Sequence, residues 1–206
     1  MKQDDLPKVS RSVFIEYSNG RLKTRDGRYV KGYVLADLYS EWDALKLLNL
    51  PNIKAQNKLF SVLYTNFLPE KLLYEFACRC AEWALSFVES PPPSAIRAIS
   101  VKRKWVTGEA TNAELDDARF ALKGALGGEP CGLPKYAARA MECVLLQTSR
   151  RGAAWETAWM THYNAAVASM EAPAHGLKFA TEEEAWDAAC EHEADILLDL
   201  ISEWSD

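Results

Sequence analysis

Apolar residues recur at three- and four-residue steps along most of the chain, and this spacing predicts a succession of amphipathic helices. The spacing begins after Gly32 and continues to the C-terminal residues. The predicted helices cover residues 35–48, 52–67, 70–89, 94–106, 111–126, 135–150, 153–170 and 182–204. The pattern therefore favours a mainly α protein.

Local signals set several of the helix ends. Thr111 and Glu114 have the spacing of a capping box, in which side chains and free amides at a helix start satisfy one another. Thr181 and Glu184 repeat that spacing before the last helix. Gly108 is expected to end the helix over 94–106, since glycine is the preferred residue just past a helix C-terminus.

The first 33 residues follow a different pattern. Segment 13–17 (VFIEY) is rich in strand-forming residues and is followed by Asn19-Gly20, a strong hairpin signal. A second turn at Asp26-Gly27 permits a third strand near 29–33. A ribbon this small needs a larger body to pack on.

The predicted fold class is thus a multi-helix bundle with a small N-terminal antiparallel β-ribbon. Three segments are expected: the ribbon at 1–33, a helical core at 34–126 and an acidic helical segment at 134–206 that forms one compact unit with the core. The Gly- and Pro-rich stretch between the last two is the candidate joint.

Composition agrees with a chain that folds on its own. Its 206 residues are 49% hydrophobic, enough to build a core. No apolar run reaches the roughly 18 residues of a membrane span, and the N-terminus lacks the apolar core of a secretory signal, so a soluble, cytoplasmic protein is expected. Five cysteines, an odd number at scattered positions, favour reduced thiols.

The net charge of −5 conceals a strong asymmetry along the chain. Residues 1–33 hold eight Lys and Arg against four Asp and Glu, and residues 34–152 hold fifteen against thirteen. Residues 153–206 hold one Lys against twelve acids. Such asymmetry bears on which surfaces attract a partner, and not on the fold.

The pair Cys78 and Cys80 raises the question of a metal or redox site. On a helix, residues two apart point about 200° away from each other, so the two thiols cannot chelate one ion together. Cys80 falls on the apolar stripe and is expected to be buried. Cys78 falls on the polar side and is expected to be a partly exposed thiol.

Motifs that would define an enzyme are missing from the sequence. There is no phosphate-binding loop and no nucleophile elbow, and the adjacent acids have no supporting base. Cys190 and His192 fail the same two-residue geometry, and His162, His175 and Cys190 have no zinc-type spacing. We therefore expect no catalytic residue, metal or cofactor. If an enzyme site is assembled from scattered residues, His162 is the first residue to mutate.

Basic and aromatic residues gather in the predicted ribbon near Tyr17, Tyr29 and Tyr33. The candidate partner-binding residues there are Arg21, Lys23, Arg25, Arg28 and Lys31. Cations neutralise phosphates and aromatic rings stack on bases, so nucleic acid is one possible partner. An acidic protein surface is another, and a merely solvated hairpin is the third interpretation. A second basic run, residues 102–104 beside Trp105, adds slightly to the case for an interaction.

The acidic C-terminal segment suggests the opposite kind of partner. Its candidate partner-binding residues are Glu182, Glu183, Glu184, Asp187 and Glu191. A layer of acids on helices can imitate a phosphate array and occupy a basic groove, or can simply keep the protein soluble. Seven tryptophans also fit mostly helical stripes, and any left exposed would be natural interface anchors.

Residues 76–122 resemble a helical domain of immunity proteins from bacterial toxin systems and of Ala-rich bacteriophage proteins. Four elements carry the resemblance: the ACRCAE helix at 77–82, the prolines at 91–93, the WVTGE step at 105–109 and the TNAE start at 111–114. The ILLDLI ending at 196–201 is similar to the close of such phage proteins. The resemblance implies a small inhibitory or neutralising protein and carries over no catalytic residue.

Together these features favour a phage- or bacterium-encoded binding protein. We expect it to inhibit or neutralise a protein complex, either an antiviral defence nuclease assembly or a toxin, by occupying a charged surface. The alternative is a nucleic-acid-binding accessory protein that uses the basic ribbon. No membrane partner is expected.

Overall fold

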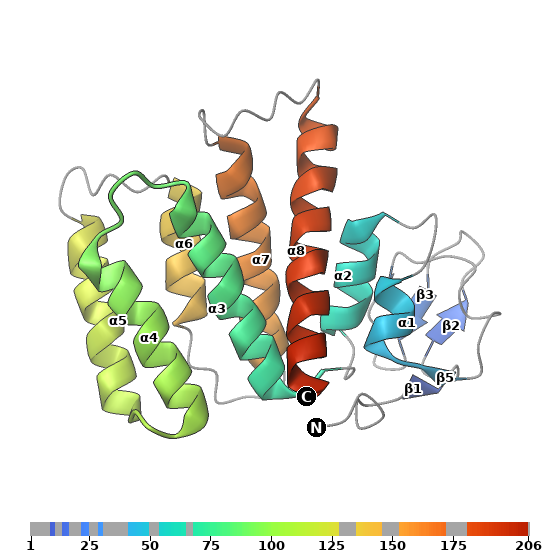
Figure 1. Cartoon of the computed structure of the whole chain (residues 1–206), viewed down its shortest axis with the longest axis horizontal. Coiled ribbons are helices and arrows are strands. Elements are labelled where there is room, and N and C mark those ends of the chain that lie inside the picture. The colour runs from blue at the N-terminus through green and yellow to red at the C-terminus, as the bar shows by residue number, and fades with distance from the viewer. Residues whose placement is uncertain are drawn as a thin grey trace. The chain divides into compact units, whose positions relative to one another are not determined.

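The computed structural model describes residues 9–10, 14–16, 22–24, 29–30, 41–49, 54–64, 68–127, 135–145, 153–171 and 181–205. These residues are mainly helical, as the hydrophobic spacing predicts (Figure 1). None of the described helices is long and apolar enough to cross a membrane.

Eight helices are described, and most lie where the sequence places them. Their bounds are α1 Ala44–Leu48, α2 Ala55–Tyr64, α3 Glu70–Ser86, α4 Pro93–Thr107, α5 Asn112–Gly127, α6 Lys135–Val144, α7 Ala153–Glu171 and α8 Glu182–Ser205. The main error is at the first helix, predicted over 35–48. Residues 41–42 form a strand instead, and α1 begins only after Asp43, whose side chain caps it by accepting from the Lys46 amide at 2.8 Å.

The strands are short. They are β1 Val9–Ser10, β2 Phe14–Glu16, β3 Leu22–Thr24, β4 Tyr29–Val30 and β5 Glu41–Trp42. Strands β2, β3 and β4 pair in that order, antiparallel, with Lys23 opposite Ile15 and Tyr29. Strand β1 pairs with β5. The turns predicted at Asn19-Gly20 and Asp26-Gly27 lie outside the described residues, and the packing of a ribbon on the helices stays a prediction.

Contacts within the chain divide it into two compact units. The first comprises residues 1–72 and 190–206, and the second comprises residues 73–189. The first unit buries apolar side chains of α1, α2 and the second half of α8, among them Leu47, Leu59, Val62 and Leu197. The sequence predicts boundaries at residue 33, where the ribbon ends, and at residues 126–134, the Gly- and Pro-rich stretch. These boundaries stay a prediction.

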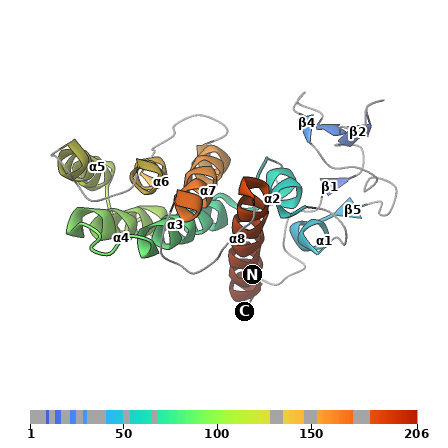
Figure 2. The same ribbon diagram turned by 90° about the horizontal axis from the view of Figure 1, so that it is seen from above.

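The second unit is built from two layers of helices. Helices α3 and α4 form one layer, and α5, α6 and α7 form the other (Figure 2). Each of α4, α5 and α6 buries one apolar stripe at three- and four-residue steps; in α6 this stripe is Ala137, Ala140, Met141 and Val144. Helix α7 packs closely on α6 and buries mostly alanines, whose small side chains let two helix backbones approach.

The expected helix caps are present. The Glu114 amide donates to Thr111 Oγ1 at 3.2 Å, and the Thr111 amide donates to Glu114 Oε2 at 2.8 Å, which confirms the first capping box. The amide and then the hydroxyl of Thr111 donate to the Glu114 carboxylate, and these two hydrogen bonds lower the pKa of that carboxyl. At α8, the Glu184 amide donates to Thr181 Oγ1 at 3.1 Å. Gly108 ends α4 with φ of 81°, in the left-handed region.

We expect Gly108→Ala to lower the free energy of unfolding by about 1 kcal/mol, because a Cβ is strained at positive φ. No atom lies within 4 Å of the added Cβ, so the cost comes from the backbone alone. Urea unfolding followed by circular dichroism measures it. The matched control is Gly124→Ala in α5, where the new Cβ also meets nothing within 4 Å. Because alanine favours a helix more than glycine does, Gly124→Ala should raise the free energy of unfolding by roughly 0.5–1 kcal/mol. Equal effects of the two changes would contradict the cap assignment.

Candidate functional site

The basic residues predicted to bind a partner are only partly placed. Lys23 lies in β3, opposite Ile15 and Tyr29 in the pairing register. Its side chain, together with Arg21, Arg25, Arg28 and Lys31, lies outside the described residues. The ribbon as a binding surface therefore stays a prediction.

The second basic run, residues 102–104 on α4, is not a basic surface. Lys102 is fully buried, Arg103 is bound by two carboxylates of α3, and only Lys104 is exposed. The suggestion that this run adds to a cationic interface is therefore wrong. The cause is tertiary, since α3 packs along the side of α4 that carries these cations.

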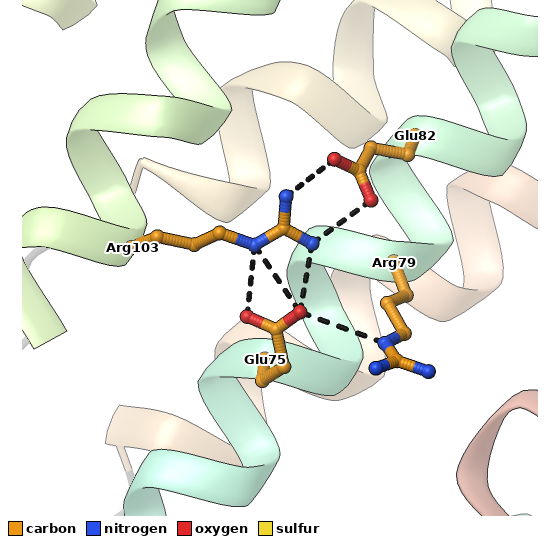
Figure 3. Close-up of polar contacts among 4 residues, drawn as sticks. All are labelled: Glu75, Arg79, Glu82 and Arg103. Atoms are coloured by element: carbon orange, nitrogen blue, oxygen red, sulfur yellow. Dashed lines mark hydrogen bonds and ion pairs between the residues drawn. The ribbon is translucent and has the colours of Figure 1, made fainter. Parts of the chain in front are cut away.

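Arg103 joins α4 to α3 through an ion-pair cluster (Figure 3). Its Nε donates to Glu75 Oε2 at 2.9 Å, and its Nη2 donates to Glu75 Oε1 at 2.7 Å and to Glu82 Oε2 at 2.9 Å. Its Nη1 donates to Glu82 Oε1. Arg79 adds a second cation, with Nε 3.5 Å from Glu75 Oε1. The cluster thus contains two cations, Arg103 of α4 and Arg79 of α3, and two anions that lie two turns apart on α3.

The geometry of this cluster suits a structural clamp. The planar guanidinium matches the two oxygens of each carboxylate, which gives strong, directional hydrogen bonds. The hydrogen bonds that Arg103 donates to Glu75, and then those to Glu82, raise the pKa of its guanidinium. The side chain of Arg103 is 36% exposed, so water screens the pairs and moderates their contribution to stability.

Lys102 lies between two aromatic rings. Its Nζ is 4.2 Å from the ring centre of Tyr74 and 4.2 Å from that of Trp105, and the two rings contact edge to face at 5.6 Å. The rings attract the ammonium through their electron-rich faces. Burial nevertheless disfavours the charged form and lowers the pKa of Lys102 from 10.5 to about 8.

Cys78 is fully buried on α3, like Cys80, so the expectation of a partly exposed thiol is wrong. Cys78 lies at the edge of the polar side of α3, close to Lys102 and Arg103 of α4, and is covered although Glu82 on that side is exposed. Burial raises the pKa of Cys78 to about 12, with nearby Glu75 adding to the rise. A thiol with that pKa stays protonated near neutral pH and is a poor nucleophile.

An open groove of about 580 Å³ runs along α4 and the end of α3. Its apolar part is formed by Leu85, Pro91, Ile96 and Ile99, and its polar part by Arg103, Lys104, Thr107 and Glu109. Ile96 is 57% exposed in this groove. A groove of this size and composition can accept apolar side chains of a peptide.

The acids predicted at the start of α8 are mostly exposed. Glu182, Glu183 and Glu184 form its first turn, where carboxylates also stabilise the positive end of the helix dipole. Asp187 is half-buried and Glu191 is exposed. Among the described residues, neither α7 nor α8 contains a Lys or Arg.

Exposed apolar residues on α7 are a feature that the sequence reasoning missed. Met160 is 40% exposed and Tyr163 is 45% exposed, and Tyr163 contacts the half-buried Trp186 of α8 at 5.5 Å between ring centres. The signal for this surface was weak, because apolar and polar residues are mixed around α7 and do not mark one side as buried. His162, on the buried side of α7, has its ring 6.3 Å from that of Trp186.

Comparison of the chain with protein-family models, curated proteins and solved structures gives no match. The resemblance to toxin-immunity and phage proteins therefore stays a prediction, and the function has to be inferred from the surfaces described above.

Replacing Lys102 should change how stability depends on pH. Because the folded-state pKa of about 8 lies below 10.5, the unfolded chain binds more protons between these values. The free energy of unfolding should therefore rise by roughly 1–3 kcal/mol from pH 7.5 to 10.5 on account of this group. The difference between the wild type and Lys102→Met, measured by urea unfolding across this range, isolates that rise. Lys104→Met controls for removal of a lysine from the same helix, and a constant wild-type–Lys102→Met difference would contradict the prediction.

Arg103→Lys should lower the free energy of unfolding by about 1–2 kcal/mol, because an ammonium cannot make the paired hydrogen bonds of the guanidinium. Arg97→Lys on the exposed face of α4 is the matched control and should change stability by less than about 0.5 kcal/mol. Chemical unfolding of both variants provides the measurement. Similar losses for the two would mean that the cluster adds nothing beyond ordinary surface charge.

Proposed function

We propose that the chain is a small, phage- or bacterium-encoded binding protein that inhibits or neutralises a protein complex by occupying one of its charged surfaces. The target is an antiviral defence nuclease assembly or a toxin. The binding residues are the acids of α8, namely Glu182, Glu183, Glu184, Asp187 and Glu191.

The observation that carries this proposal is the one-sided charge of α7 and α8. The first turn of α8 exposes three consecutive carboxylates, and the described residues of these two helices include no Lys or Arg. Glu183, Asp187 and Glu191 follow one another at four-residue steps, so carboxylates recur along one side of α8. A basic partner surface would be complementary in charge to this side of the helix.

The proposed mechanism is steric blocking guided by charge. Long-range attraction between the acids and a basic groove speeds encounter and selects orientation, whereas well-packed apolar groups provide most of the lifetime of the complex. Toxins and nucleases that act on nucleic acid expose basic grooves for phosphates, and an acidic helix can occupy such a groove. No covalent chemistry is required.

Nucleic-acid binding through Arg21, Lys23, Arg25 and Arg28 is the second proposal. The excess of cations over acids in residues 1–33 favours it. It has no support from α4, where Lys102 is buried and Arg103 is bound to carboxylates. Labelled DNA or RNA whose mobility does not change at low salt would eliminate it.

The test of the first proposal uses the triple variant Glu182→Lys, Glu183→Lys and Glu184→Lys. Affinity capture from the host with nuclease treatment should return a stoichiometric protein partner. The triple variant should bind that purified partner at least about tenfold more weakly at physiological salt, because each substitution replaces attraction with repulsion.

The matched control reverses three other exposed acids, Glu70, Glu89 and Asp117, which gives the same change in net charge. It should keep binding within about threefold. Circular dichroism of both variants checks that the helices are retained. A partner bound equally well by the α8 triple variant, or equally weakened by the control, would show that α8 is not the binding surface.

A further inference from the structure

Helix α7 has an apolar face that the rest of the described chain leaves uncovered. Met160, Tyr163, Val167 and Met170 follow one another at steps of three and four residues, so they lie within about 80° of the helix circumference. Met160 and Tyr163 are exposed, and Val167 and Met170 are half-buried. The opposite side of α7 carries Thr157, Ala158, Thr161 and Ala165, all buried.

This exposure departs from the usual outcome, because a helix at a surface normally has a polar outer face. Two large side chains, a methionine and a tyrosine, are among the four exposed large hydrophobic residues of the described chain. Both types are common anchors of protein interfaces.

Trp186 extends the apolar face from α7 onto α8. Its ring lies 5.5 Å from that of Tyr163, at an interplanar angle of 57°. The two rings thus present adjacent aromatic surface from two helices. Rings in this arrangement accept both apolar side chains and the cations of Lys and Arg.

Carboxylates border this surface. Glu156 is exposed one turn before Met160 on α7, and Glu182 and Glu183 are exposed one turn before Trp186 on α8. Residues three and four apart are neighbours on a helix, so these acids adjoin the apolar residues. Neither of these two helices contains a Lys or Arg, so the border carries charge of one sign.

We infer that Met160, Tyr163 and Trp186 form the apolar centre of a docking surface for a basic amphipathic segment of a partner protein. Leu-, Ile- or Phe-type side chains of the segment would cover Met160 and Tyr163. Its Lys or Arg residues would reach Glu156, Glu182 and Glu183 and lie over the faces of Tyr163 and Trp186. The acidic border disfavours nucleic acid and anionic lipid as occupants. This inference deepens the proposed function and rests on it only for the use of the α8 acids.

The test starts from a phage-displayed library of random 16-residue peptides selected against the full chain at physiological salt. We expect enrichment of peptides that combine Lys or Arg with large aliphatic or aromatic residues. The most enriched peptide is then synthesised and titrated against the wild type and variants by calorimetry. No enrichment, or enrichment of peptides without a basic bias, would overturn the inference.

Variants locate the site of the peptide. Tyr163→Ala and Met160→Lys should each weaken binding at least about tenfold, and the pair Glu182→Gln and Glu183→Gln should weaken it by about threefold to tenfold and reduce its salt dependence. Met160→Lys places a charge at an already exposed position, so it tests the surface even if Tyr163→Ala disturbs folding. If all of these variants bind the peptide as tightly as the wild type does, the inference is overturned.

Two matched controls distinguish binding at this surface from nonspecific binding of the peptide. Phe120 is 70% exposed on α5, and Glu89 is exposed after α3. Phe120→Ala and Glu89→Gln should leave the affinity within about twofold. Equal losses in these controls would also overturn the inference.

The outcomes separate this inference from the proposed function. If basic peptides bind at Tyr163 but the host yields no protein partner, the docking surface stands and the inhibitory function fails. If the host partner binds through Glu182–Glu184 and tolerates Tyr163→Ala and Met160→Lys, the function stands and the docking surface fails.

Discussion

The packing of α4 against α3 is the constraint on which the described chemistry of the second unit depends. Arg103 reaches across to Glu75 and Glu82, and Lys102 inserts between Tyr74 and Trp105. Once α4 is held in this way, Cys78 is enclosed and its thiol is protonated. The same contact buries Lys102, pairs the partly exposed Arg103 with two carboxylates, and leaves an open groove beside Ile96. A run that looks like a nucleic-acid contact in sequence is therefore an interhelical clamp.

Removing an ammonium fully, and a guanidinium partly, from water carries a desolvation cost, and the two charges are compensated differently. Arg103 keeps its charge because two carboxylates supply directed hydrogen bonds and water reaches part of the cluster. Lys102 receives a weaker compensation from two ring faces, and burial lowers its pKa to about 8. Adjacent residues of one helix thus differ in how firmly they hold a proton. The difference comes from their surroundings, since both are ordinary basic residues in the sequence.

Helices α7 and α8 illustrate the opposite case, in which apolar and acidic side chains stay at the surface. The buried side of α7 carries alanines and threonines that suit close packing on α6, together with His162 and Asn164, and Met160 and Tyr163 lie on the other side. The acids in the first turn of α8 lie beside Trp186, and neither α7 nor α8 contains a Lys or Arg. An aromatic centre with a border of one charge sign is a common composition for a protein-binding surface. The binding function proposed above follows from this combination.

The sequence by itself determined the helices and most of their ends, because these depend on near neighbours. The Thr111–Glu114 box and the Gly108 stop involve residues at most a few positions apart, and both form as predicted. Near neighbours do not say which face of a helix another helix will cover. Only the tertiary structure decided that Cys78 and Lys102 are buried and that Tyr163 is exposed, because Cys78 and Lys102 lie where α3 and α4 meet, whereas Tyr163 faces away from the buried side of α7.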